Sequence, residues 1–222
     1  MRAPANTPAP SSANSPASAG TRRWVAAGLC ALAGSQLVLG ALSPWWYLAG
    51  SSSGTSSTVA FYPGGLLHLV TSGGGGTTSY AQAGAPSVGV LYDVVLGALL
   101  GLTIVVAAIA ADALRRERGT PGSRTVRRAV RLALVGAIVG CAVMAAAVPV
   151  AQPVLYRWDD PAGACAAAQP PPACGSFWGS SSRSGVASTW GAGAGWWLDV
   201  LAILPLGVTW AIERRRPLRP AR

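Results

Sequence analysis

The chain has 222 residues, of which 51% are hydrophobic and only 11% are charged. Soluble domains carry about 25% charged residues, so this chain lacks the polar surface of a water-soluble protein. Its net charge of +10 would in a soluble protein indicate nucleic-acid binding. The positions of the arginines along the chain indicate a membrane protein instead, and no nucleic-acid partner is expected.

Residues 1–21 are rich in Pro, Ala and Ser and contain almost no large apolar side chain, which predicts a disordered tail. After this tail, apolar runs of about 20 residues predict membrane spans, because a bilayer core is about 30 Å thick. Four such spans are predicted, at 24–42, 88–111, 129–151 and 193–212. The predicted fold is therefore an all-α membrane protein built as a four-helix transmembrane bundle.

The first span follows Arg22 and Arg23, so a cleaved signal peptide is the alternative to a membrane anchor. Its apolar run is 19 residues long. Signal peptides have apolar regions of about 7–15 residues, which favours an uncleaved anchor.

The arginines predict the orientation of the spans, because basic residues near span ends stay in the cytoplasm. Fifteen of the 17 arginines lie in the two termini or between residues 112 and 131, at the start of the third span, and only Arg157 and Arg183 lie elsewhere. This distribution predicts a multi-pass protein of the cell membrane with both termini cytoplasmic and the lipid bilayer as its partner. Binding of anionic lipid by the arginine clusters is an alternative explanation. The predicted segments are an inner loop at 112–128, a basic tail at 213–222 and outer loops at 43–87 and 152–192.

The second and third spans each contain a GxxxG motif, which predicts close packing between them. The motifs are Gly97 with Gly101 and Gly136 with Gly140. Glycines at this spacing let helix backbones approach closely in lipid. The alternative is chance, because the chain contains 28 glycines.

The two outer loops are expected to pack on each other as an extracytoplasmic cap. The first loop is rich in Ser, Gly and Thr and includes the apolar piece 65–70, so it predicts short β-strands or an interfacial segment. In the second loop, Cys165 and Cys174 flank a Pro-Pro-Pro stretch on the oxidising side, which predicts a disulfide. A zinc site is the weaker alternative because zinc needs about four ligands and His68 is the only histidine.

Few residues of the chain suit catalysis. A single histidine excludes a two-histidine metalloprotease motif, and the sequence contains no phosphate-binding loop or paired CxxC. We expect no catalytic, metal or cofactor site, and His68 is interpreted as structural. Asp159 and Asp160 predict a solvated turn before Pro161 rather than a calcium site. Two further cysteines, Cys30 and Cys141, fall inside spans and are expected to act as small apolar side chains.

Asp93 and Asp199 stand out because a carboxylate inside a span suggests function. Both are predicted near the outer ends of their spans. One interpretation is structural: they accept hydrogen bonds from the cap or pair with Arg157 or Arg183. The other is a proton- or cation-binding pair at the outer mouth of the bundle.

Two short stretches resemble small, uncharacterised four-span proteins of prokaryotes. These are Val90-Leu-Tyr-Asp-Val94 and the run from Ser176-Phe-Trp-Gly179 to Trp196-Trp-Leu198. The resemblance implies four spans and no known activity. The layout is also similar to that of claudin-like tetraspans, but the first outer loop has no cysteine and the claudin signature is missing. No junction-forming function is therefore transferred.

Two functions remain open from the sequence. The favoured one is a non-catalytic membrane scaffold that binds a protein partner, or another copy of itself, through its cap. The alternative is a small transporter or channel component that uses Asp93 and Asp199.

Overall fold

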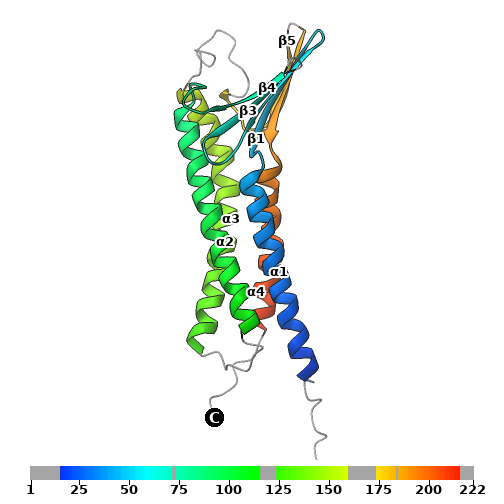
Figure 1. Cartoon of the computed structure of the whole chain (residues 1–222), viewed down its shortest axis with the longest axis vertical. Coiled ribbons are helices and arrows are strands. Elements are labelled where there is room, and N and C mark those ends of the chain that lie inside the picture. Colours follow the sequence, from blue (N-terminus) through cyan, green and yellow to red (C-terminus); the bar gives the residue numbers. More distant parts are fainter. Residues whose placement is uncertain (1–15, 72–73, 116–123, 160–173, 184, 216–222) are drawn as a thin grey trace, which may run out of the picture.

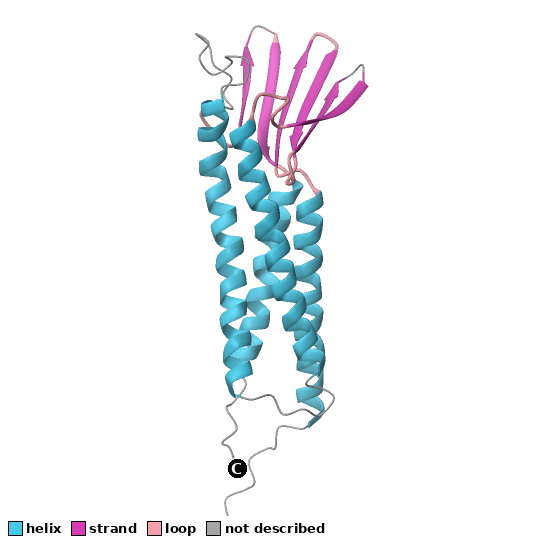
Figure 2. Cartoon of the chain, turned by 60° about the vertical axis from the view of Figure 1, so that its left-hand side comes forward, coloured by secondary structure: helices cyan, strands magenta, loops and turns pink. Residues whose placement is uncertain are grey.

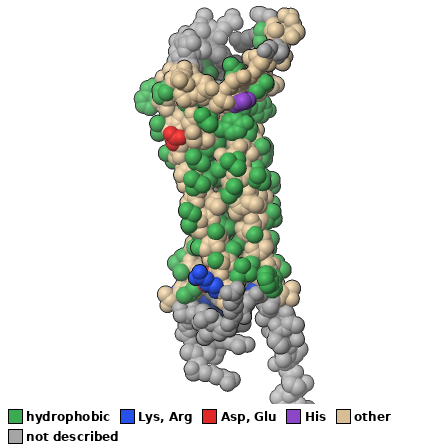
Figure 3. Space-filling model, viewed as in Figure 1, with side chains coloured by type: hydrophobic (Ala, Val, Ile, Leu, Met, Phe, Trp, Pro, Cys, Tyr) green, Lys and Arg blue, Asp and Glu red, His purple; other side chains and the backbone are tan. Residues whose placement is uncertain are grey.

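Four helices run side by side along the long axis of the molecule, and a β-sheet lies at one end of them (Figure 1). We call this end the sheet end and the other the arginine end, because basic side chains gather there on the visible face (Figure 3). The computed structural model describes residues 16–71, 74–115, 124–159, 174–183 and 185–215.

All four predicted spans are helices. They are α1 (Pro16–Leu42), α2 (Pro86–Arg115), α3 (Arg124–Asp159) and α4 (Ala194–Arg214). Each contains a stretch long and apolar enough to cross a membrane. Helix α1 packs on α2 and α4, and α3 packs on the same two helices. The described part of the chain thus has the architecture of a multi-pass membrane protein.

Helix α3 continues to Asp159, eight residues beyond the predicted end of its span at 151, although it contains Pro149 and Pro153. Proline has no backbone N–H, so Pro149 leaves the carbonyl of Ala145 without its helical partner. The indole Nε1 of Trp196 on α4 donates to this carbonyl at 3.1 Å. A hydrogen bond from the neighbouring helix thus replaces one that proline removes.

Helices α2 and α3 rise farther toward the sheet end than α1 and α4 do (Figures 1 and 2). Asp159, the last residue of α3, joins them there. Its carboxylate oxygens accept hydrogen bonds from the backbone N–H groups of Ser87 and Val88, at 3.1 and 3.0 Å. The predicted solvated turn is therefore wrong for Asp159, which caps the start of α2. Asp160 and Pro161 lie outside the described residues.

The two predicted outer loops form one antiparallel sheet, which confirms the β-strands predicted as one possibility for the first loop and limits the all-α description to the spans. Its six strands have the order β4-β3-β2-β1-β6-β5. The strands are β1 (Trp46–Ser52), β2 (Thr55–Phe61), β3 (Leu66–Thr71), β4 (Gly74–Ser79), β5 (Gly179–Arg183) and β6 (Val186–Ala192). The first loop supplies β1–β4 and the second supplies β5 and β6. Pairing of β1 with β6 makes the two loops one unit.

An aromatic cluster joins the sheet to the projecting parts of α2 and α3. Trp46 and Phe61 are cross-strand partners on one face of the sheet, with ring centroids 4.8 Å apart. Phe61 also lies 6.3 Å from Tyr92 of α2 and 6.3 Å from Tyr156 of α3. Trp46, Phe61 and Tyr92 are at most 2% exposed. Burial of these rings fixes the sheet against the helices.

Strands β1 and β6 continue directly from the ends of α1 and α4, and a close backbone contact holds this junction. The N–H of Gly195 donates to Pro44 O, and the N–H of Gly193 donates to Trp45 O. A Cβ at Gly195 would lie 2.8 Å from Gly40 O, which is closer than any real Cβ contact. Only glycine fits at this crossing of α1 and α4.

The predicted glycine packing of α2 on α3 is largely wrong. Gly97, Gly101 and Gly136 are exposed and have open space where a Cβ would lie, whereas Gly140 alone receives a side chain, that of Leu102. The spacing of the motifs is helical, but three of these glycines are on outward faces. Close glycine contact occurs instead between α1 and α4.

Candidate functional site

Three hairpins, β1–β2, β3–β4 and β5–β6, turn at the end of the sheet that lies farthest from the helices (Figures 1 and 2). We call this end the sheet tip. The β1–β2 end runs Ser-Ser-Ser-Gly-Thr-Ser-Ser at 51–57, with Gly54 at a φ of +91°. The β5–β6 end turns at Gly185, with a φ of +78°. Positive φ angles favour glycine, so these two turns are set by the sequence.

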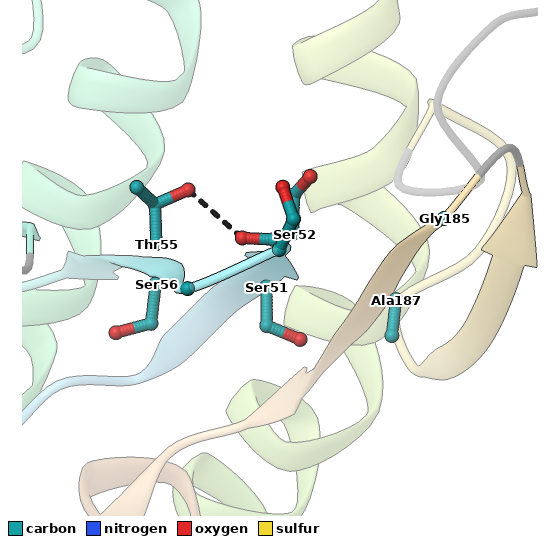
Figure 4. A pocket seen from close by; sticks show the side chains of 8 residues that line it. Ser51, Ser52, Thr55, Ser56, Gly185 and Ala187 are labelled. Carbon is teal, nitrogen blue, oxygen red and sulfur yellow. Dashed lines mark hydrogen bonds between the residues drawn. The ribbon is translucent and has the colours of Figure 1, made fainter.

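The tip carries a shallow hollow of about 380 Å³ between the β1–β2 and β5–β6 ends (Figure 4). It is lined by Ser51, Ser52, Ser53, Gly54, Thr55, Ser56, Gly185 and Ala187. Thr55 Oγ1 donates to Ser52 O at 3.0 Å, which orders the turn. A second hollow of about 390 Å³ includes Val186 and Thr71. Because neighbouring strand residues point to opposite faces, the two hollows lie on the two faces of one tip.

The two hollows offer neutral hydrogen-bonding groups. The residues that line the two hollows are Ser, Thr, Gly, Ala and Val, with no charged and no aromatic residue among them. Serine and glycine in binding loops supply adaptable hydrogen bonds. Such a surface suits a polar, uncharged region of a partner.

His68 lies in β3 and has a structural contact. Its Nδ1 lies 3.0 Å from Thr77 Oγ1, on the cross-strand partner in β4. The hydrogen bond links β3 to the edge strand β4, as expected for a structural histidine.

Tyr80, which follows β4, supports the base of the sheet. Its hydroxyl donates to Tyr62 O at 2.8 Å. Burial raises the pKa of Tyr80, although the bond to the Tyr62 carbonyl opposes part of this shift. The phenol therefore stays protonated and keeps donating this bond at physiological pH.

Asp93 and Asp199 lie in different environments. Asp93 is exposed on α2, next to Gly65 of the β2–β3 turn. Asp199 on α4 is fully buried, and neither of its carboxylate oxygens has a hydrogen-bond partner. Among the described residues, Asp159 joins α3 to the start of α2, and Trp46 Nε1 joins the two outer segments by donating to Phe177 O at 2.5 Å.

The cysteines fall into two groups. Cys30 and Cys141 are buried and free, in agreement with their predicted role as apolar side chains. Cys174 is buried before β5, but Cys165 lies outside the described residues. The Cys165–Cys174 disulfide therefore stays a prediction.

Sequence reasoning missed Asp159 and the indole of Trp196. Both act across helices that are far apart in the sequence, so only a contact map could have revealed them. Within the described ranges, no three His, Cys, Asp or Glu residues are grouped so as to hold a metal ion.

No protein-family model matches the chain. No curated protein matches it either.

Proposed function

We propose that the protein is a non-catalytic membrane receptor or scaffold that holds its sheet outside the cell and binds a partner through the sheet tip. The observation that carries the proposal is the construction of the tip. Hairpin ends from both outer segments meet there, far from the helices, and line two neutral hollows with hydroxyl groups.

The attachment of the sheet supports this proposal. A binding surface loses less entropy on association when it is held rigidly before binding. The aromatic cluster around Phe61 and the glycine contact at Gly195 fix the sheet to all four helices or to their direct extensions. The sheet is thus a stiff support for the tip, which lies one strand length, seven residues in β1, from the junction with the helices.

Site-specific photo-crosslinking in living cells tests the proposal. A photoreactive residue replaces Ser56 at the tip, and a matched one replaces Ala81, which is also exposed but lies at the base of the sheet near α2. We expect one defined crosslinked product from position 56 and none of the same size from position 81.

Substitutions at the tip complete the test. Thr55→Lys together with Ala187→Lys adds charge and bulk at the tip and should abolish the product formed in the otherwise unchanged protein. Equal crosslinking from positions 56 and 81, or persistence of the product after both substitutions, contradicts recognition by the tip.

Transport remains the second proposal, and the burial of Asp199 favours it. The pair suggested by the sequence needs Asp93 and Asp199 to act together, whereas Asp93 is exposed and Asp199 is buried. Loss of a proton-coupled flux in both Asp93→Asn and Asp199→Asn, with folding intact, would support it over recognition.

A further inference from the structure

The interior of the bundle contains a layer of polar groups that recognition by the sheet tip does not use. Asp199 on α4 is 0% exposed and both its carboxylate oxygens lack hydrogen-bond partners. On α1, the side-chain oxygen of Gln36 is also buried without a partner. On α3, Cys141 is fully buried and free.

Contacts one helical turn away place these three groups together. Gly40 of α1 meets Gly195 of α4, and Gln36 and Asp199 each lie four residues farther into the bundle on antiparallel helices. Trp196 of α4 bonds Ala145 of α3, and Cys141 lies one turn below Ala145. By this spacing Gln36, Asp199 and Cys141 lie at the same level of the bundle, and we call these residues the Asp199 layer.

Among the residues that the structure describes, no basic side chain is bonded to Asp199. On the three helices concerned, the described arginine closest in sequence to this layer is Arg131, ten residues from Cys141, or about 15 Å along α3. Arg131 donates instead to the backbone carbonyl of Glu213 at the arginine end. The other titratable group in the layer is the Cys141 thiol, which is a weak donor and carries no positive charge.

An ionised carboxylate buried without a partner is strongly unfavourable, and in a membrane span such a group marks a proton or ion site. We propose that the Asp199 layer binds one monovalent cation, a proton or a sodium ion, which neutralises the carboxylate. The bound charge is shared with the oxygen of Gln36, the buried acceptor in the layer. This site is independent of Asp93 and of the sheet tip.

The layer lies one turn below the junction from which β1 and β6 arise. Occupancy of the site is thus coupled to the packing of α1 on α4, and through it to β1 and β6, the paired strands that join the two outer segments. This placement gives cation binding a direct route to the stability of the whole protein.

Two measurements on the purified full-length protein test the proposal and separate the two cations. Thermal unfolding is followed with increasing sodium chloride, with choline chloride as the control for ionic strength. If the ligand is sodium, the midpoint rises by roughly 5–10 °C at a concentration about 100 times the Kd. If the ligand is a proton, infrared spectra show a buried carboxylic-acid C=O band at neutral pH. The unfolding midpoint then does not change with sodium concentration and falls at alkaline pH.

Asp199→Asn should remove whichever signal is found, and Gln36→Leu should weaken the sodium response or shift the carboxylic-acid band. Asp93→Asn is the matched control, since it removes an exposed carboxylate and should leave the signal unchanged. If Asp199→Asn does not fold, the band is assigned in folded protein in two ways. Labelling aspartate with ¹³C shows that the band comes from an aspartate, and its shift in Gln36→Leu places that aspartate in the Asp199 layer. An ionised Asp199 together with a midpoint that ignores sodium overturns the proposal.

Discussion

At the scale of single residues, Asp159 contributes to stability through bonds that cross from one helix to another. Its two carboxylate oxygens accept the N–H groups of Ser87 and Val88 in the first turn of α2. Those N–H groups have no partner within their own helix, and a carboxylate there also interacts favourably with the helix dipole.

We therefore expect Asp159→Ala to lower the free energy of unfolding by about 1 kcal/mol. Thermal unfolding in detergent, followed by tryptophan fluorescence, measures the change. Asp93→Asn removes an exposed negative charge beyond the first turn of the same helix and should have a smaller effect. An equal loss in both variants would show that general charge, not the cap, is responsible.

Gly195 is a second residue whose role follows from local geometry. Its Cα faces Trp45 and Gly40 O at the crossing of α1 and α4, where a Cβ has no room. Gly195→Ala should destabilise the protein by about 1–3 kcal/mol, as overpacking does elsewhere.

The control for this substitution is Gly101→Ala. Gly101 has open space at its Cβ position and lies within a helix, where alanine is the better residue. Its unfolding midpoint should stay unchanged or rise. A fall in the midpoint as large as that of Gly195→Ala would place Gly101 in a packed interface after all.

At the scale of elements, α3 and α4 share a hydrogen bond that proline made necessary. Trp196→Phe removes the hydrogen bond that Ala145 O accepts from α4 and leaves this carbonyl without the donor that replaces the N–H of Pro149, at a cost of about 1–3 kcal/mol. Pro149→Ala restores a backbone N–H that can reach the same carbonyl.

A double-mutant cycle in thermal unfolding tests this explanation. Trp196→Phe should cost about 1 kcal/mol less in the Pro149→Ala background than in the native chain. Additive effects of the two substitutions would mean that the indole stabilises α3 through packing alone.

At the scale of the whole molecule, the orientation in the membrane is the prediction on which the function depends. Arg128, at the start of α3, and Ser56, at the sheet tip, are both exposed and lie at opposite ends of the bundle. The positive-inside rule predicts that only the tip faces outward.

Labelling of intact cells with a membrane-impermeant thiol reagent checks this orientation. Ser56→Cys should be labelled, whereas Arg128→Cys should react only after the membrane is opened. The native Cys30 and Cys141 are buried, and the chain without an introduced cysteine measures any labelling of Cys165 and Cys174. Labelling of Arg128→Cys in intact cells would reverse the orientation and remove the basis for an external receptor.

The sequence by itself determined the four spans, because the length and apolar content of a helix that crosses lipid are local properties. It also identified Asp199 as unusual, and it predicted a cap from both outer loops. It did not predict the extension of α3 through Pro149 and Pro153, since the bond that compensates for Pro149 comes from Trp196 on another helix.

Only the tertiary structure decided which polar and small residues act together. A GxxxG spacing gives one helix face but does not say which face meets a neighbour, so Gly97 and Gly101 turned outward while Gly40 and Gly195 met. Strand pairing between β1 and β6 joins residues about 140 apart in the chain, and no local signal encodes it. The different exposure of Asp93 and Asp199 has the same cause. Burial depends on how whole helices pack, whereas the local sequence gives only the position of a residue along its own helix.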